Sequence, residues 1–444
     1  MSDADELVRY CFDVVVPMDP DLSVLDGGVV EVSQGRIVYV GQPEDAPRNP
    51  GRTVRLGGLA MPGLVNTHAH TPMSLVRGAG DGLPLMRWLT EVMWPREGQM
   101  TPEDVAWGMR LGAAEMLRCG ITTTCEMYLF EEAVVEGARD AGIRLVMTPA
   151  MISALHGEDF GTSQARLDEL VAFHRTHHDP DGTVTVGLAP HSAYDLGIDR
   201  CAEIAAAAQD IDALLHLHLV ETRDEGRELE AAHGGTSTTR LLAEAGVFDG
   251  RVLAAHAVWL DDEDLRLVAE HGVAVAHCPM SNMKLGSGVA RVPELLAAGV
   301  TVGLATDGPA SNDALDLWQE LRMTPMLARV SRLDAAALGP ADTLAMATHG
   351  GATALGLDGV GRLAVGQRAD MIRLDIEDPA FVPVTRPEEL VAHLAWSAGA
   401  RHVTDVWVEG ARVVEDGQCL TIDMERAVAE GHERGRRLAR ASGT

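Results

Sequence analysis

The chain has 444 residues, enough for one large domain and an accessory domain. Apolar residues make up 46% of it, so we expect a globular protein with a sizeable core. Lysine and arginine together number 36 against 66 acidic residues, and the formal net charge of −30 repels nucleic acid phosphates and anionic membranes. We therefore expect neither a nucleic acid nor a membrane as a partner.

The cysteines and the chain start carry no export or disulfide signal. The six cysteines are scattered without a CxxC pair, so the sequence suggests neither a structural zinc knuckle nor a disulfide framework. The chain starts with MSDADELVRY, which is acidic and lacks the apolar region of a signal peptide. No run of 18 apolar residues occurs, so we expect no membrane span and a cytoplasmic location.

Both ends of the chain have the short apolar runs and turns of a β-rich domain. Residues 29–41 (VVEVSQGRIVYVG) have the pattern of a β-hairpin, and residues 369–376 and 403–417 are again strand-like. We predict that the two ends pair into one small β-sandwich. Residues 1–57 would form its first part, and residues 356–444 its second part plus a terminal helix.

The middle segment, residues 58–355, alternates eight apolar runs with helical stretches. Such continuous apolar runs are typical of strands buried on both faces in a parallel sheet. Eight strand–helix units over about 300 residues fit an α/β fold of the (β/α)8 barrel type. A doubly wound open sheet uses the same units, but no GxGxxG motif follows the first run to support the commonest such sheet.

One helix can be bounded from its sequence. In residues 101–120, Thr101 can cap the helix, Pro102 fits its first turn and Asp104 completes a capping box. Gly120 is expected to end it. The apolar residues between them recur on one helical face, as in a helix that covers a barrel.

Most of the eight runs end in an acidic residue or a histidine. These residues are His68 and His70, Glu126, His191, His218 and Glu221, His256, His277 and Asp307. The active site of a (β/α)8 barrel lies at the carboxyl ends of its strands. Simple packing does not explain this repetition, because buried polar groups need partners.

The pair His68 and His70 is the first candidate for a metal site. Residues i and i+2 of a strand point to the same side, so both imidazoles can reach one ion. His218 and Asp307 come from distant runs that end on the same rim. Three imidazoles and one carboxylate suit zinc, with iron as the alternative, and an open position makes such a site catalytic in type.

Further residues near this set suggest acid–base chemistry. Glu221 lies three residues after His218 and is either a proton donor with a pKa raised by a closed pocket or an ordinary carboxylate at a helix start. His256 can stabilise a developing oxyanion, and Asp307 can accept a proton from water as well as bind metal. His277 is at least as well explained by structural support.

Together these motifs resemble the amidohydrolase superfamily, in particular its 5-methylthioadenosine/S-adenosylhomocysteine deaminases. The similarity covers nearly the whole chain and includes PGLVNTHAHTPMSLVRG, LPLMRWL, WPRE, GITTTCEMY, GLAPHSAY, HLHLVET, AAHAVWL, HCPMSNMKLGSG and ATDGPASND. The resemblance implies a (β/α)8 barrel of the metal-dependent hydrolase type and hydrolytic deamination of an adenosine-type nucleoside to the inosine analogue and ammonia.

The resemblance also implies roles for single residues. It implies metal ligation by His68, His70, His218 and Asp307, with His256 as a catalytic neighbour and Glu221 as the donor of a proton to a purine ring nitrogen. The residues implied to contact substrate are Glu97 on the ribose hydroxyls, His191, and Trp88 as a pocket wall. Related two-metal sites use a carboxylated lysine, but the only lysine, Lys284, follows the seventh run. We therefore predict one divalent metal ion per chain, and we also expect a homo-oligomer.

One departure from the family pattern concerns the 5′ end of the substrate. Pro149 stands about where the family often has an arginine, and Arg166 corresponds to a second arginine by a less secure alignment. Such arginines would pair with the homocysteine carboxylate. The loss of one weakens the case for S-adenosylhomocysteine and leaves open adenosine, 5′-deoxyadenosine, methylthioadenosine and other 5′-modified adenosines, including aminodeoxyfutalosine.

Other functions remain as alternatives. A guanine, pterin or cytosine deaminase, or a triazine hydrolase, would share the metal site and differ in the pocket. A non-catalytic barrel scaffold is disfavoured by the complete ligand set with Glu221. The smaller cytidine deaminase fold needs HxE followed by PCxxC, and only the first, His156-Gly157-Glu158, is present.

Overall fold

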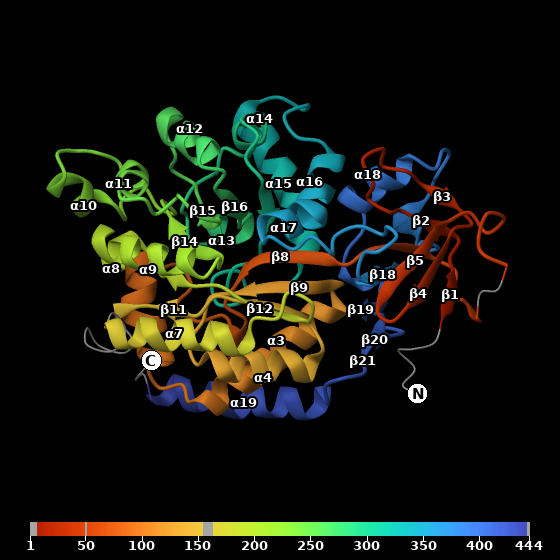
Figure 1. The fold of residues 1–444 in the computed structure, drawn as a ribbon, viewed down its shortest axis with the longest axis horizontal. Helices are drawn as coiled ribbons and strands as arrows, with labels where there is room; N and C mark the ends of the chain where they lie inside the picture. The colour runs from red at the N-terminus through yellow and green to blue at the C-terminus, as the bar shows by residue number, and fades with distance from the viewer. Residues whose placement is uncertain (1–6, 49–50, 154–162, 442–444) are drawn as a thin grey trace.

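The computed structural model describes residues 7–48, 51–153 and 163–441 and has two parts (Figure 1). The first part is a small β-domain in which strands from the two ends of the chain lie side by side. One of its sheets is antiparallel apart from one pair and has the order β5 (Arg36–Gly41), β4 (Val29–Ser33), β1 (Val8–Cys11), β6 (Arg52–Arg55). The other has the order β21 (Gln418–Cys419), β20 (Ala411–Glu415), β19 (Val403–Val408), β18 (Met371–Leu374), β7 (Leu59–Pro62), β2 (Val14–Val15), β3 (Leu25–Asp26).

Apolar side chains from both sheets form one core in this domain. Tyr10 of β1 lies edge-on to the buried Trp407 of β19, with their ring centroids 5.3 Å apart. The predicted β-sandwich built from both termini is therefore confirmed. Strand β7 lies within the segment predicted for the barrel but pairs with β2 and β18, so the chain enters the barrel at residue 64.

The second part is a closed (β/α)8 barrel, as predicted. Its strands form two parallel four-stranded sheets: β8 (Leu64–Ala69), β9 (Ile121–Glu126), β10 (Arg144–Met147), β12 (Val184–Val186), and β14 (Leu215–Leu219), β15 (Val252–His256), β16 (Ala274–His277), β17 (Val302–Leu304). Parallel bridges between Ala69 and Asp307 and between Leu188 and Leu215 join the two sheets into a ring. Short strands β11 (Ala150–Met151) and β13 (Ala189–Pro190) extend the third and fourth positions.

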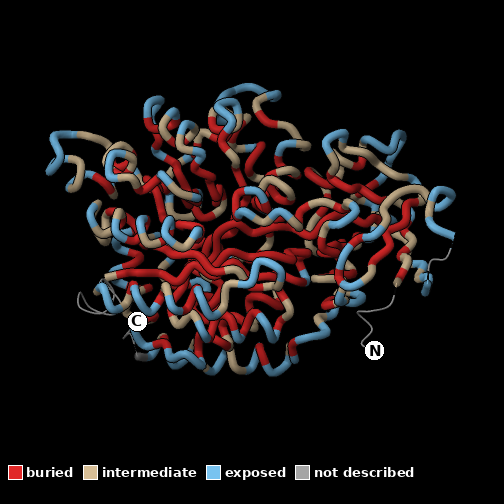
Figure 2. The backbone as a smooth tube through the Cα atoms, in the orientation of Figure 1, coloured by how far each residue is buried: buried red, intermediate tan, exposed pale blue. Residues whose placement is uncertain are grey.

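Helices surround the barrel, and its strands are the most deeply buried part of the chain (Figure 2). The main helices of the barrel part are α3 (Pro102–Arg118), α4 (Glu131–Ala141), α7 (Gln164–His177), α9 (Ile198–Asp210), α11 (Thr238–Glu244), α12 (Asp262–Glu270), α14 (Val292–Ala297), α15 (Leu317–Arg332), α16 (Pro340–Ala347) and α17 (His349–Ala354). Shorter helices over the carboxyl ends include η2 (Thr71–Val76), α1 (Leu85–Trp88), η3 (Leu89–Met93), α2 (Trp94–Glu97), α8 (Ala193–Leu196), α10 (Arg227–Ala232) and α13 (Pro279–Lys284). Helix α18 (Glu389–Trp396) precedes β19.

The predicted capping box of α3 is present. Thr101 accepts a hydrogen bond from the Asp104 amide at 3.3 Å, and its own amide donates to Asp104 Oδ2 at 2.7 Å. The helix ends before Gly120, whose φ of +86° favours glycine. Both predicted ends of this helix are therefore correct to within two residues.

The terminal helix α19 (Met424–Ala441) packs on the barrel and lies beneath α3 and α4 in Figure 1. Arg434 and Arg437 both hydrogen-bond the buried Asp104 carboxylate at the start of α3. A β-carbon at Gly435 would lie 2.8 Å from the Leu75 carbonyl oxygen, so glycine allows the helix to approach η2 closely. No helix in residues 7–48, 51–153 and 163–441 combines the length and apolar character of a membrane span.

Candidate active site

The first and last strands of the barrel bring three predicted ligands together. His68 and His70 lie at the end of β8, and Asp307 follows β17. Asp307 Oδ1 lies 3.3 Å from Nε2 of each histidine. Two ligand atoms held tetrahedrally at about 2.0–2.1 Å from one zinc ion lie about 3.4 Å apart. The three side chains are therefore spaced as ligands of one metal ion.

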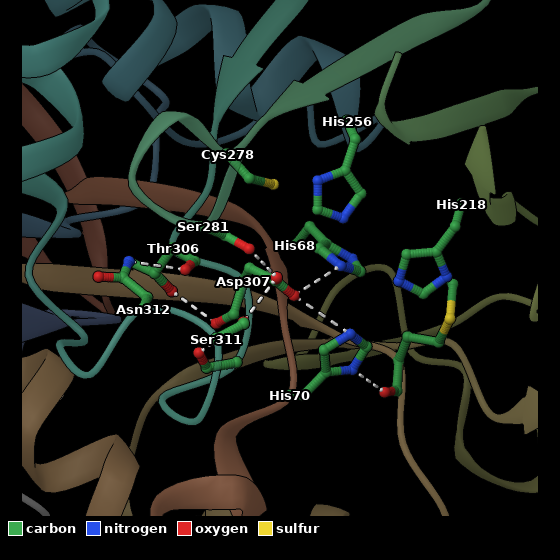
Figure 3. A network of polar contacts seen from close by, with 12 residues as sticks. His68, His70, His218, His256, Cys278, Ser281, Thr306, Asp307, Ser311 and Asn312 are labelled. Atoms are coloured by element: carbon green, nitrogen blue, oxygen red, sulfur yellow. Dashed lines mark hydrogen bonds and ion pairs between the residues drawn. The ribbon is translucent and has the colours of Figure 1, made fainter. Parts of the chain in front are cut away.

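His218 at the end of β14 and His256 at the end of β15 complete the cluster (Figure 3). The ligand atoms of His68, His218 and His256 lie within 4.8 Å of one another, as do those of His68, His70 and Asp307. The rings of His218 and His256 are stacked with centroids 5.5 Å apart. The five residues thus form one cluster at the carboxyl ends of β8, β14, β15 and β17.

In His70, His218 and His256, Nδ1 has a partner outside the cluster, so Nε2 faces the middle of the cluster. His70 Nδ1 lies 2.6 Å from the Met127 carbonyl oxygen and His218 Nδ1 lies 3.0 Å from that of His191. His256 Nδ1 lies 2.9 Å from Asn282 Oδ1. A carbonyl oxygen only accepts hydrogen bonds, so Nδ1 carries the hydrogen in His70 and His218, and Nε2 keeps its lone pair for a metal ion.

Two further features fit a metal ion. His68 Nε2 is buried without a hydrogen-bond partner. This is a costly state for a polar atom unless a metal ion in the middle of the cluster binds it. Asp307 Oδ2 accepts hydrogen bonds from Ser281 at 2.6 Å and Ser311 at 2.7 Å, which leaves Oδ1 for the cluster. Burial lowers the pKa of His68 to about 3 and that of His218 well below its usual value, so both are neutral, as ligands must be.

Three strand ends that carry the site have strained backbone. Val220, His256 and Asp307 have φ values of 40°, 69° and 58°, in the left-handed region that costs non-glycine residues about 1–2 kcal/mol each. Such strain persists only where the surrounding structure enforces it. Here the strained residues lie at or just after the ends of β14, β15 and β17, where the backbone leaves the barrel beside a site residue.

Glu221 faces this cluster from the loop after β14. Its Oε2 lies 3.7 Å from His256 Nε2, and its Oε1 accepts a hydrogen bond from Ser287 at 3.2 Å. Burial raises the pKa of Glu221, with His256 opposing the shift. Burial disfavours the charged form of His256, but the negative charges of Glu221 and Asp307 outweigh it and raise the pKa of this histidine. Glu221 therefore retains its proton to higher pH than an exposed glutamate does.

Glu97 lies in α2 and lines the same cavity as Glu221. Tyr128 donates a hydrogen bond to its Oε1 at 2.8 Å, and burial raises the pKa of Glu97 to about 7. Trp88 lines the cavity with its ring and donates its indole N–H to the Ala79 carbonyl at 3.1 Å. His191 also lines it, with a pKa lowered to about 4 by burial.

The cavity together with its open mouth has a volume of about 620 Å³. Its polar lining gathers around the histidine cluster, Glu221 and Glu97, whereas the remaining wall is mostly apolar. The apolar and aromatic lining residues are Met73, Leu85, Trp88, Leu89, Trp94, Met127, Tyr128, Leu129, Ala150, Ile152, Tyr194 and Leu285. None of the described lining residues is lysine or arginine. Such a pocket suits an uncharged, partly aromatic molecule.

Some residues singled out from the sequence lie elsewhere. Arg166 is not among the described lining residues of the cavity and pairs with both carboxylate oxygens of Glu131 at 3.0 and 2.9 Å. The contact between Arg166 and a substrate carboxylate stays a prediction. His277 is buried but also outside the lining. Lys284 donates to the Ala310 carbonyl at 2.9 Å and to Asp313, away from the histidine cluster. His156 and Glu158 of the HxE match lie outside the described residues.

Sequence reasoning missed several residues that support the site. Tyr128 donates a hydrogen bond to Glu97, Ser281 and Ser311 donate to Asp307, and Ser287 donates to Glu221. All four stand in motifs that carry the family resemblance, but residue type and spacing assigned them no role. His216 is different, because it stands two residues before His218 on the same strand and therefore points to the same side. That spacing is the signal that could have found it.

A (β/α)8 barrel with a histidine–carboxylate cluster at the carboxyl ends of its strands defines the class of metal-dependent hydrolases. The sequence model described as the amidohydrolase family matches residues 59–413. The chain belongs to the amidohydrolase family.

Curated relatives and solved structures agree with this assignment. A protein of Pelotomaculum thermopropionicum named 5-methylthioadenosine/S-adenosylhomocysteine deaminase is 39% identical over 96% of this chain and 97% of its own length. A Bacillus cereus protein of the same name is 35% identical over 97% and 99%. The zinc-bound adenosine deaminase of Xanthomonas campestris has a TM-score of 0.91 and 34% identity, covering 97% of this chain and 98% of its own.

A second type of neighbour is named for a different activity. The atrazine chlorohydrolase of Arthrobacter aurescens TC1, complexed with zinc, has a TM-score of 0.86 and 26% identity, covering 96% of this chain and all of its own. The fold and its metal site thus occur with more than one reaction, and the pocket has to distinguish them.

Proposed function

We propose that the protein is a zinc-dependent aminohydrolase that deaminates adenosine-type nucleosides to the inosine analogue and ammonia. The observation that carries the proposal is the joint presence in one cavity of the histidine–aspartate cluster, a buried acid at Glu221 and a buried carboxyl group at Glu97. The names of the curated relatives and of the Xanthomonas structure support the same reaction.

His68, His70, His218 and Asp307 would hold one divalent metal ion, and the zinc in both neighbouring structures favours that metal. A zinc ion lowers the pKa of water and so makes a nucleophile available at neutral pH. The absence of Lys284 from the cluster supports a single ion, because no lysine is present there to bridge two.

The chain's own residues would carry the proton transfers. Burial raises the pKa of Glu221, which would deliver a proton to a purine ring nitrogen while water replaces the amino group. His256 lies beside it with a raised pKa and would stabilise negative charge on the oxygen that adds to the ring. Asp307 would accept the proton that water loses.

Glu97 and the apolar wall would bind the nucleoside. A carboxylate accepts hydrogen bonds from two neighbouring hydroxyl groups, as a ribose offers, and Tyr128 holds Glu97 in place. Trp88 and His191 line the same cavity, where they would contact the substrate.

The 5′ substituent that fits best is uncharged. No lysine or arginine is among the described lining residues, and the sequence of residues 154–162 contains neither. The carboxylate of S-adenosylhomocysteine would therefore lack a cationic partner. Because burying a polar or charged group without a partner costs about 1–3 kcal/mol, we expect kcat/KM for methylthioadenosine to exceed that for S-adenosylhomocysteine by about 10- to 100-fold.

The decisive experiment is an ultraviolet absorbance screen for conversion of adenine to hypoxanthine. The panel contains adenosine, 5′-deoxyadenosine, methylthioadenosine, S-adenosylhomocysteine and aminodeoxyfutalosine, with guanine and a triazine as controls. Turnover of one or more adenosines is expected. Turnover of a control and of no adenosine would refute the nucleoside proposal.

The variant Glu221→Gln tests the role of Glu221 as proton donor. It keeps the size and hydrogen-bonding capacity of the side chain but has no proton to donate as an acid. It should retain zinc and lose about a hundredfold or more in kcat, the usual effect of a positioned acid. A rate close to that of the unaltered enzyme would remove Glu221 from this role.

A further inference from the structure

A chain of buried hydrogen bonds leads from His68 away from the cavity into the barrel interior. His68 Nδ1 lies 2.9 Å from His216 Nε2, and His216 Nδ1 lies 2.9 Å from Thr148 Oγ1. Thr148 Oγ1 in turn lies 2.9 Å from the backbone carbonyl oxygen of Glu126. These four residues have no solvent exposure, so bulk water does not reach any link.

Three strands supply this chain. His68 ends β8, His216 lies in β14, and Thr148 directly follows β10, whose partner strand β9 ends with Glu126. Parallel pairing of β9 and β10 fixes the carbonyl of Glu126 next to Thr148, whose amide also donates to it at 2.8 Å. The far end of the chain is therefore anchored to the backbone.

The direction of the hydrogen bonds follows from chemistry at the two ends. A metal ion on His68 Nε2 requires the lone pair there, so the hydrogen of this ring must be on Nδ1 and donate to His216 Nε2. His216 then carries its hydrogen on Nδ1 and donates to Thr148 Oγ1. Thr148 can accept it because its own hydroxyl hydrogen goes to the Glu126 carbonyl, which can only accept.

We propose that His216 and Thr148 are positioning residues of the metal centre, which hold His68 in the tautomer that binds a metal ion through Nε2. The proposal rests on His68 being a ligand, as proposed above. Neither residue touches the cavity, and their effect reaches the metal only through His68.

The opposite tautomers show why the Thr148 hydroxyl matters. If it were absent, an Nδ1–H on His216 would be buried without an acceptor, at a cost of about 1–3 kcal/mol. His216 would then favour a hydrogen on Nε2, and this hydrogen would be donated to His68 Nδ1. The hydrogen of His68 would then be on Nε2, where it blocks the lone pair that a metal ion needs. Cys125 Sγ, 3.7 Å from His216 Nδ1, is only a weak acceptor and cannot replace the hydroxyl.

The test compares Thr148→Val, which removes the hydroxyl at nearly constant shape, with Thr148→Ser, which retains it. Zinc affinity of the purified full chain is measured by competition with a chromophoric chelator, and metal content by elemental analysis. Thr148→Val should bind zinc about 10- to 100-fold more weakly than the unaltered protein, the usual effect of losing an outer hydrogen-bond partner of a ligand. Thr148→Ser should stay within about twofold of the unaltered protein, the scatter expected for a retained hydrogen bond.

A purely structural role would give a different result. It would lower the thermal midpoint of the zinc-free protein and leave zinc affinity unchanged, and that outcome refutes the proposal. If Thr148→Val does not fold, Thr148→Ala replaces it as a second variant without the hydroxyl, and His216→Gln is added. In His216→Gln the amide oxygen of the glutamine can still accept a hydrogen bond from His68 Nδ1, so this variant should keep most of its affinity for zinc.

The same measurements separate this proposal from the proposed reaction. Zinc binding that depends on Thr148 in a protein without deaminase activity would refute the reaction and uphold the positioning role. Failure of the unaltered protein to bind zinc would refute the metal site and this proposal together.

Discussion

Replacing Glu97 by glutamine should stabilise the protein at alkaline pH while it impairs nucleoside binding. The carboxyl group is buried, and its pKa is raised from 4.5 to about 7. Folding therefore forces an ionised carboxylate into surroundings that disfavour its charge. Glutamine has nearly the same shape and carries no charge at any pH.

The size and sign of the effect follow from the two pKa values. Below pH 4.5 the group is protonated in the folded and the unfolded chain, and the substitution changes little. Between pH 4.5 and about 7 the unfolded chain ionises first, so the fold loses about 1.4 kcal/mol for each pH unit. Above pH 7 the loss levels off at about 3 kcal/mol, and Glu97→Gln should be more stable by up to that amount.

Denaturant unfolding of the metal-free protein at pH 5 and pH 8.5 measures this difference. Glu228→Gln is the control, because Glu228 is exposed on α10 and should show no such pH dependence. An equal free energy of unfolding for Glu97→Gln and the unaltered protein at pH 8.5 would refute the reasoning. In the same variant, KM for a nucleoside should rise about 10-fold or more, because one of two charged acceptors for the ribose hydroxyls is lost.

Three further substitutions test two groups that hold the site and one that holds the terminal helix. Tyr128→Phe removes a hydrogen bond that lowers the pKa of Glu97, so the rise in nucleoside KM at low pH should set in at a higher pH than in the unaltered enzyme. Ser287→Ala removes a hydrogen bond that lowers the pKa of Glu221, so the alkaline limb of the kcat profile should move to higher pH; an unmoved limb would contradict the contact. Arg434→Ala should lower the free energy of unfolding by about 1.5–3 kcal/mol, since it removes a charged partner of the buried Asp104, whereas Arg436→Ala, at an exposed position of α19, should change it little.

Much of the fold was predictable because its signals are local. Eight continuous apolar runs alternate with helical stretches, and the capping residues around α3 are spaced as any such helix requires. The HxH pair at His68 and His70 depends only on the two-residue period of a strand. The entry of β7 into the terminal sheet was missed, because its pairing with β18 joins residues more than 300 positions apart.

The site was predictable in its residues and not in its contacts. Polar residues at strand ends identified His218, Glu221, His256 and Asp307, since every strand of a parallel barrel ends on the same rim. The pairing of Arg166 with Glu131 could not be predicted, because it depends on how α7 lies against the start of α4.

The sequence by itself determined the order of strands and helices, the family resemblance and the set of polar side chains at the barrel rim, since each depends on residue type and short spacing. The tertiary structure decided which nitrogen of each histidine faces the centre, which oxygen of Asp307 is free, and that the cavity wall offers no described cation. It also showed that His216 and Thr148 continue the site into the barrel. These properties arise from contacts between strands that are distant in the chain, and barrel closure alone brings them within hydrogen-bonding distance.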